Sequence, residues 1–265
     1  MNGIERHRMH ARFEALRRHR LSACAVAFAA AAAMPGVFGD LDPVAAILVI
    51  VLLVICLGIH EAAHAWVAWK CGDPTGKDMG RITLNPIPHI DPFMSIILPG
   101  ILLLSTGVLF GGAKPVPVNF HRLRHPWRDM SLVALAGPAS NFLLALFFLI
   151  ALKFFVSTGF YNNASSTVTA RYDDVLPLVL YTTVQFNLLL TVFNLVPIPP
   201  LDGSRVMAWL LPPGIRTPYA ALEPFGLLIV MALAYFSPEF RLFLNHTMSS
   251  MFDALNKIAS LGGVW

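Results

Sequence analysis

The feature that most constrains this sequence is an apolar run from residue 44 to residue 69, which contains His60, Glu61 and His64 near its carboxyl end. The first basic residue after the run is Lys70. About 20 consecutive apolar residues are enough to cross a bilayer as a helix. Because polar groups buried in hydrocarbon without partners are costly, ionisable residues inside a span indicate a functional site. The run therefore predicts a membrane helix that carries such a site.

The spacing of these three residues indicates which chemistry the helix carries. Residues four apart on a helix share one face and lie about 6 Å apart along the axis, so His60 and His64 can bind one metal ion. Glu61 projects in a neighbouring direction, where it can act on a metal-bound water without being a ligand. This is the His-Glu-x-x-His pattern of zinc peptidases. The alternative, a chance match or two histidines hydrogen-bonded within a bundle, is disfavoured by the cost of their burial. The pattern still needs a third ligand.

The composition indicates a polytopic membrane protein. Hydrophobic residues make up 56% of the chain and charged residues 13%, whereas soluble domains carry about a quarter charged residues. At 265 residues the chain has room for about five to seven spans and for no sizeable extra soluble domain. The excess of 19 Lys and Arg over 15 Asp and Glu is clustered, which argues for membrane topology rather than for nucleic-acid binding. Cys24, Cys56 and Cys71 predict neither a disulfide framework nor a cysteine zinc site.

The amino-terminal residues predict the orientation of the chain. Residues 1–20 contain six arginines and two glutamates, and we expect a basic cytoplasmic arm there. Residues 21–38 are alanine-rich and predict a first span. With the amino terminus inside, the run at 44–69 returns its histidine-bearing end to the cytoplasm. We expect residues 21–236 to form a single membrane-embedded domain with its core at 44–236, and residues 237–265 to form an interfacial tail.

The remaining chain predicts an all-α bundle of about five to six transmembrane helices. Further apolar runs lie at 131–156, 175–196 and 220–236. The run at 93–110 is interrupted by Pro99-Gly100 and predicts a re-entrant hairpin. A short strand is expected at 81–84 between turn residues, and an extended segment at 111–119. These two segments predict a small β element near the cytoplasmic face.

Asp202 is the candidate for the third ligand. It follows a span and a break in which Pro197, Pro199 and Pro200 forbid a regular helix. Irregular backbone at membrane depth is tolerated where it lines a polar cavity, and two histidines with one carboxylate make a catalytic zinc shell. The alternative is an ordinary turn aspartate before glycine. His89 and Asp91 are also possible ligands, although their neighbouring prolines favour ordinary loop polar groups.

Topology tests this assignment, because Asp202 must emerge on the same side as the histidines. If 93–110 were a full span, Asp202 would lie outside. If it is a hairpin, Asp202 arrives on the cytoplasmic side, together with Lys114 and the basic patch that follows it. The asparagine-bearing loop at 158–174 then lies outside, which agrees with the positive-inside rule.

Three motifs carry a resemblance to a known family: His60-Glu61-Ala62-Ala63-His64, Gly137-Pro138-Ala139-Ser140-Asn141, and the stretch Asn-Leu-Val-Pro-Ile-Pro-Pro-Leu-Asp-Gly at 194–203. Together they resemble the site-2 protease family of intramembrane zinc metallopeptidases. The connecting stretches Gly72-Asp73-Pro74-Thr75, Leu84-Asn85-Pro86, His89-Ile90-Asp91-Pro92 and 113–118 look like its compact bacterial subgroup, which lacks PDZ and CBS domains. The resemblance runs from about residue 44 to residue 236.

The resemblance implies a site and an activity. His60, His64 and Asp202 would bind one zinc ion, Glu61 would be catalytic, and Asn194 would face the substrate or its oxyanion. Asn141 would line the substrate site or only pack against the catalytic helix. The activity implied is intramembrane peptide hydrolysis near the cytoplasmic face of a bacterial cell membrane. Its substrates would be membrane proteins whose spanning segment is locally unwound, and the segment at 111–119 could pair with them as an edge strand.

Two other functions remain open at this point. One is a zinc peptidase whose third ligand is a helical glutamate, for which only Glu223 and Glu239 lie at a useful distance after the motif. The other is a metal transporter or a catalytically silent metal-binding membrane protein. A transporter would place polar groups along several spans, whereas here they gather at one depth.

Overall fold

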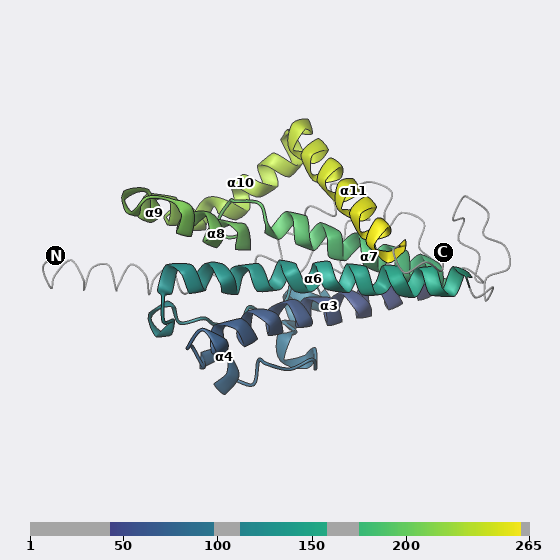
Figure 1. Ribbon diagram of the computed structural model, residues 1–265, viewed down its shortest axis with the longest axis horizontal. Coiled ribbons are helices and arrows are strands. Elements are labelled where there is room, and N and C mark those ends of the chain that lie inside the picture. The colour runs from purple at the N-terminus through teal and green to yellow at the C-terminus, as the bar shows by residue number, and fades with distance from the viewer. Residues whose placement is uncertain (1–42, 98–111, 158–174, 261–265) are drawn as a thin grey trace, which may run out of the picture.

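The computed structural model describes residues 43–97, 112–157 and 175–260 of the chain (Figure 1). Every regular element in these ranges is helical. The α-helices are α3 (Pro43–Lys70), α4 (Thr75–Asp78), α6 (Pro126–Ser157), α7 (Val175–Asn194), α8 (Asp202–Leu210), α9 (Pro213–Ala220), α10 (Glu223–Phe236) and α11 (Pro238–Ser260). Shorter turns are η1 (Ile87–His89), η2 (Pro92–Ile97) and η3 (Phe120–Arg122). The predicted basic arm, the first span, the Pro99-Gly100 hairpin and the loop at 158–174 lie outside the described residues.

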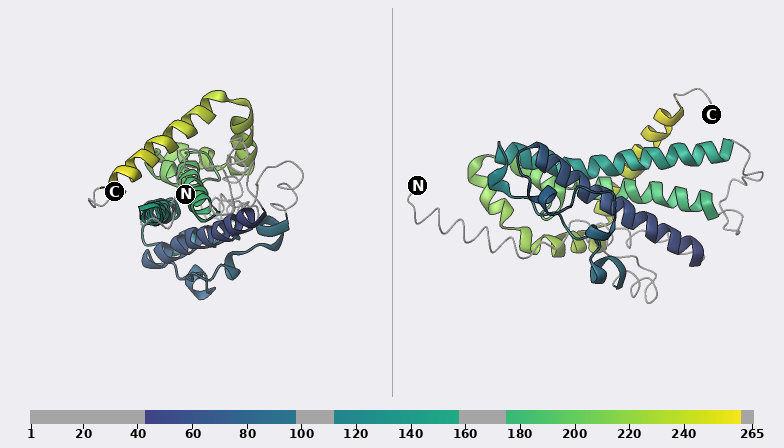
Figure 2. Two further views of the ribbon diagram at one scale, coloured as in Figure 1. Left: turned by 90° about the vertical axis from the view of Figure 1, so that its right-hand side faces the viewer. Right: turned by 90° about the horizontal axis from the view of Figure 1, so that it is seen from below.

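Three long helices form the centre of the bundle. α3, α6 and α7 contain 28, 32 and 20 residues, so each reaches at least about 30 Å, the thickness of the hydrocarbon core. All three are apolar enough to cross a membrane. They run alongside one another in Figures 1 and 2, and each contacts the other two. Their shared core includes Leu53, Ala145 and Phe193, while Leu143 and Phe147 remain exposed. These helices therefore make the protein a membrane protein.

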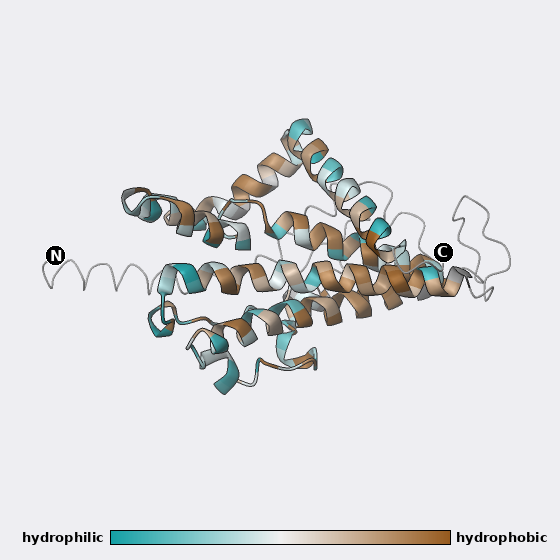
Figure 3. Ribbon diagram, viewed as in Figure 1, coloured by the Kyte–Doolittle hydropathy of each residue, from teal (hydrophilic) through white to brown (hydrophobic). Residues whose placement is uncertain are grey.

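A fourth span is possible at α9 and α10. The two helices pass the same apolar test together, but they bend by 52° at the break between them. The described residues thus contain three or four candidate spans of the five to six expected. In Figure 3 the apolar colouring follows α3, α6, α7 and α10, whereas α4 and the start of α6 are polar.

The carboxyl-terminal helix α11 packs on the bundle. Leu244, Met248 and Leu255 are buried against the core, and the rings of Phe252 and Tyr181 meet at 6.3 Å. Lys153 of α6 donates hydrogen bonds to the Asn256 carbonyl and the Ser260 hydroxyl at the end of α11. One face of α11 is thus buried against α6 and α7, while Leu242 and Phe243 remain exposed.

The expected β element is not found in the described ranges, where neither segment forms a strand. The polar groups at 81–84 form hydrogen bonds within the local loop instead of with a second strand. The Arg81 guanidinium donates to the Pro88 carbonyl, and the Thr83 hydroxyl accepts from the backbone N–H of Asn85. The strap at 112–119, as we call that segment, is interrupted by two prolines without N–H groups.

Several backbone amides of the strap bind side chains or loop carbonyls. The Lys114 N–H donates to the His89 carbonyl, and the Asn119 N–H donates to the Asp73 carboxylate. The strap is therefore held by side chains and loops rather than by a β ladder.

Candidate metal centre

Helix α3 places the two histidines and the glutamate at the centre of the bundle. His60, Glu61 and His64 are buried, with exposed fractions of 1%, 5% and 8%. The Nε2 atoms of His60 and His64 lie 3.0 Å apart, because residues four apart share a helix face. Both histidines thus present the same ring nitrogen to one point.

Asp202 reaches this point from the start of α8. Its Oδ2 atom lies 3.4 Å from the Nε2 atom of each histidine, without hydrogen-bond geometry to either. One ligand atom from each of the three residues lies within 4.8 Å of the others. Burial alone would raise the pKa of Asp202, but the imidazoles of His64 and His60 hold it below its ordinary value. Asp202 therefore brings a third polar side chain to the two imidazoles.

A close backbone approach fixes the turn that carries Asp202. A Cβ atom on Gly203 would lie 2.1 Å from the Leu195 carbonyl oxygen, so no larger residue fits there unless the backbone shifts. The Leu201 N–H donates to the Ile198 carbonyl inside the proline-rich break. The turn is thereby folded onto the end of α7, and α8 starts directly beside the histidines.

Helix α6 orients both imidazoles from the side opposite the ligand atoms. The His64 Nδ1 atom lies 2.6 Å from the Val133 carbonyl oxygen. A carbonyl only accepts, so His64 carries its proton on Nδ1 and presents a lone pair on Nε2. Backbone or carboxylate partners of this kind commonly fix the tautomer of a metal-binding histidine.

Asn141 makes the corresponding contact to His60. Its Nδ2 atom lies 3.0 Å from His60 Nδ1, and its buried Oδ1 atom accepts no hydrogen bond within the described part of the chain. The two ends of an amide are assigned rather than observed. With the amide turned over, Oδ1 accepts from Nδ1–H, and His60 also presents a lone pair on Nε2. That arrangement is the one a metal ion requires.

Gly137 lets α6 come close enough to make these contacts. A Cβ atom at this position would lie 2.5 Å from ring atoms of both His60 and His64. The histidines therefore occupy the space that any other side chain would fill.

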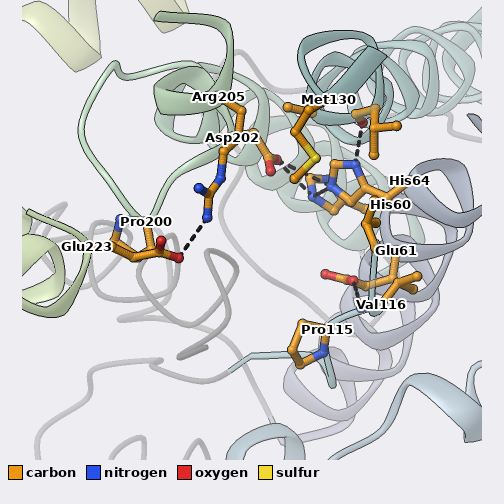
Figure 4. Close-up of a pocket in the computed structure, with 13 residues that line it drawn as sticks. His60, Glu61, His64, Pro115, Val116, Met130, Pro200, Asp202, Arg205 and Glu223 are labelled. Atoms are coloured by element: carbon orange, nitrogen blue, oxygen red, sulfur yellow. Dashed lines mark hydrogen bonds and ion pairs between the residues drawn. The ribbon is translucent and has the colours of Figure 1, made fainter. Parts of the chain in front are cut away.

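Glu61 faces the same cavity without joining the ligand group. Its Oε2 atom accepts a 2.8 Å hydrogen bond from the Val116 N–H of the strap. The cavity has a volume of about 90 Å³ and is lined by the ligand group, Glu61 and residues of α6, the strap, α8 and α10. Figure 4 shows Glu61 and Asp202 on either side of the histidines. The Glu61 carboxylate thus lies beside the candidate metal position without belonging to the ligand group.

The donor set fits zinc. Two imidazole nitrogens and one carboxylate oxygen are borderline donors of the kind that zinc prefers, and three protein ligands leave a fourth position for water or substrate. The Asp202 Oδ2 atom has no hydrogen-bond partner among the described residues, and the two Nε2 atoms lie 3.0 Å apart. A cation bound between them would pair with the oxygen and accept the lone pairs of both nitrogens. The described residues therefore contain a His-His-Asp candidate metal site.

The other sequence candidates are not members of the ligand group. Asn194 is fully buried at the end of α7, its amide donates to the Leu190 carbonyl, and neither Asn194 nor Asn141 lines the cavity. His89 is buried at the end of η1, and its Nε2 atom is 3.3 Å from the Thr83 carbonyl oxygen. Burial lowers the pKa of His89 below its ordinary value. Asp91 accepts from the Phe93 amide.

The two glutamates considered as alternative ligands have other partners. Glu223 lines the cavity but pairs with Arg205 at 2.7 Å rather than with a histidine. Glu239 lies at the start of α11, where it accepts from the Ser237 hydroxyl.

Several contributors to the site had no strong sequence signal. The Val133 carbonyl and the Val116 N–H are backbone groups, which any residue supplies. Gly137 lies in the motif that carried the family resemblance, and that motif could have suggested a close helix approach. Arg205 follows Asp202 by three residues, but its partner lies on a distant helix.

Comparison with known proteins finds relatives in bacteria. The Bacillus subtilis protein named "Putative zinc metalloprotease YwhC" is 39% identical over 186 residues, which cover 69% of this chain and 78% of that protein. "Putative zinc metalloprotease Rip2" of Mycolicibacterium smegmatis is 32% identical over 71% of this chain and 66% of its own length. Its Mycobacterium tuberculosis namesake is 30% identical over the same shares. No family model and no solved structure matches the chain.

Proposed function

Because the chain belongs to the site-2 protease family of zinc metalloproteases, we propose that it is an intramembrane endopeptidase acting on membrane-protein substrates. One observation carries this proposal: His60 and His64 of α3 and Asp202 of α8 converge on one point beside Glu61. His60, His64 and Asp202 hold a single zinc ion. Zinc bound there lowers the pKa of a water molecule towards about 7 and polarises the scissile carbonyl.

Glu61 acts as the general base. Its carboxylate accepts a proton from the attacking water and later donates it to the leaving amine. The Val116 N–H holds one oxygen of Glu61 at 2.8 Å, so the strap fixes the direction in which the carboxylate points. Asn141 and the Val133 carbonyl hold the imidazoles in the tautomer that binds metal. Asn194 remains a candidate for the oxyanion contact, and it would need to turn from its bond with the Leu190 carbonyl.

The substrate reaches the site as unwound chain. A helix in lipid satisfies its own backbone groups and hides them from attack. The reacting groups line a cavity bounded by α3, α6, the strap, α8 and α10, and an unwound segment presents its scissile carbonyl to them. We therefore expect substrates with a locally unwound spanning segment.

The active site faces the cytoplasm of a bacterial cell. Exposed basic residues surround the end of α3 that carries the histidines and the start of α6: Lys70, Lys77, Lys114, Arg122 and Arg124. Basic residues concentrate on the cytoplasmic side of membrane proteins. This distribution supports cleavage near the inner face of the cell membrane.

A Glu61→Gln variant tests the proposal. Glutamine keeps the shape of the side chain but cannot accept the proton, so cleavage of a membrane reporter should fall by about 10²- to 10⁴-fold. Zinc content, measured by elemental analysis of the purified protein, should stay at the wild-type level.

The same experiment separates the rival functions. Unchanged cleavage in the Glu61→Gln variant would show that Glu61 is not the base. Zinc flux into proteoliposomes that is equal in both proteins, with no cleavage by either, would identify a transporter instead.

A further inference from the structure

The cavity at the metal site has a second charged end that catalysis does not use. Arg205 of α8 and Glu223 of α10 both line it, and their side chains form an ion pair of 2.7 Å. Apolar groups also line the cavity, among them Met130, Val133 and Pro200. Figure 4 shows the guanidinium of Arg205 between Asp202 and Glu223.

Arg205 is the more accessible member of the pair. Its side chain is 27% exposed, against 13% for Glu223. A guanidinium has five N–H donors, and one of them is bound to Glu223. No other described residue accepts a hydrogen bond from Arg205. The end of the cavity therefore offers a cation with unused donors, already held in place by a half-buried carboxylate.

The position of Arg205 relates it to the scissile bond. It follows Asp202 by three residues on α8, so both side chains lie on one side of that helix. An extended peptide advances about 3.3 Å per residue. Residues three apart rise about 4.5 Å along a helix, and three residues of extended substrate span about 10 Å. A substrate whose scissile carbonyl lies at the ligand group can therefore place a side chain beside the guanidinium within about three residues of that bond.

We propose that Arg205 selects substrates that carry an acidic side chain within about three residues of the scissile bond. This inference rests on the proposed function. The substrate carboxylate binds the unused N–H groups, so that Arg205 bridges it and Glu223, as the planar fork of arginine allows. Glu223 orients Arg205 and balances its charge when the cavity is empty. A basic side chain at the same place has no lone pair for the unused N–H groups and gains no such bond.

A charge exchange provides the test. The probes are membrane-spanning peptides of leucine and alanine with a glycine-proline centre, identical except for Asp, Asn or Lys at one position near the centre. Cleavage is followed by mass spectrometry in detergent. The wild type should cleave the Asp peptide about 10- to 100-fold more efficiently than the Asn peptide, since hydrogen bonds to charged groups contribute that much. The double variant Arg205→Glu with Glu223→Arg should prefer the Lys peptide over the Asp peptide.

The outcomes separate this inference from the proposed function. If the wild type cuts all three peptides equally, the inference fails while the protease stands. If the double variant keeps the wild-type order, the pair is only structural and the inference fails again. If no peptide is cut by zinc-loaded wild type, the proposed function itself fails and the inference with it.

The matched control is Lys257→Glu, a charge reversal on the exposed face of α11, which should leave the preference unchanged. Zinc content is measured for each protein. Because the wild-type series alone can refute the inference, poor folding of the double variant does not leave it untested.

Discussion

At the scale of single residues, groups behind the imidazoles fix the metal-facing side of the site. His64 contacts the Val133 backbone carbonyl at 2.6 Å, a group that remains whatever residue occupies position 133. His60 contacts the Asn141 side chain at 3.0 Å, and a substitution at position 141 removes that partner. Asn141 therefore acts through His60 as a positioning residue, and its effect should appear in metal affinity before it appears in catalysis.

An Asn141→Leu variant should bind zinc about 10- to 100-fold more weakly, the usual cost of losing the partner of a metal-binding histidine. An Asn141→Asp variant should retain most of the affinity, because a carboxylate accepts from Nδ1–H in the same way. Zinc competition with a chromophoric chelator measures both. Equal affinities in the wild type and the Leu variant would contradict this role.

The residues of the site differ in how far the sequence predicted them. The spacing of His60, Glu61 and His64 follows from one helix and needs no fold. Asp202 was predicted from the proline-rich break and the topology of the spans, and the family resemblance implied the same ligand; the structure brings it to 3.4 Å from both histidines. Val133 and Arg205 could not be predicted, because their roles depend on the register between helices far apart in the sequence.

At the scale of elements, the site depends on how closely α6 approaches α3. Gly137 marks the closest point, since a Cβ atom there would lie 2.5 Å from both imidazoles. Thr191 of α7 also donates to the Pro138 carbonyl at 3.3 Å, next to this point. The three long helices thus meet at the level of the ligand group.

A Gly137→Ala variant should lose zinc although alanine favours a helix by about 1 kcal/mol over glycine. The added methyl group displaces the imidazoles or separates the helices. Gly214→Ala is the matched control, because no atom lies within 4 Å of its Cβ position. Elemental analysis of both purified variants compares them. Wild-type zinc content in Gly137→Ala would refute the close approach.

The predicted helices agree with the structure where apolar length decided them. The runs at 44–69, 131–156 and 175–196 correspond to α3, α6 and α7 within five residues at either end. Helices α8 and α9 were not predicted, because they are short, at 9 and 8 residues, and α9 begins at Pro213 and contains Pro218. The prediction of a β element was wrong within the described residues. Its residue types favour extended chain, but backbone amides of the strap donate to side chains and loop carbonyls instead of to a second strand.

At the scale of the whole molecule, the orientation of the bundle decides which compartment receives the product. Lys77 lies in α4, just beyond the histidine-bearing end of α3. Lys257 lies in α11 near its contact with Lys153 of α6, toward the opposite end of the bundle. The proposed cytoplasmic site requires these two lysines to lie on different sides of the membrane.

Single cysteines in a chain whose native cysteines are replaced by alanine can test this orientation. Lys77→Cys should react with an impermeant maleimide only after the cells are permeabilised. Lys257→Cys should react in intact spheroplasts. The reverse pattern would place the site on the outer face.

The central claim is that His60, His64 and Asp202 hold one zinc ion, and zinc stoichiometry tests it most directly. Elemental analysis of purified Asp202→Ala and Glu223→Ala proteins compares the carboxylate beside the histidines with the carboxylate of the neighbouring ion pair. We expect Asp202→Ala to lose its zinc and Glu223→Ala to keep one ion per chain. Zinc retained in Asp202→Ala and lost in Glu223→Ala would contradict the site described.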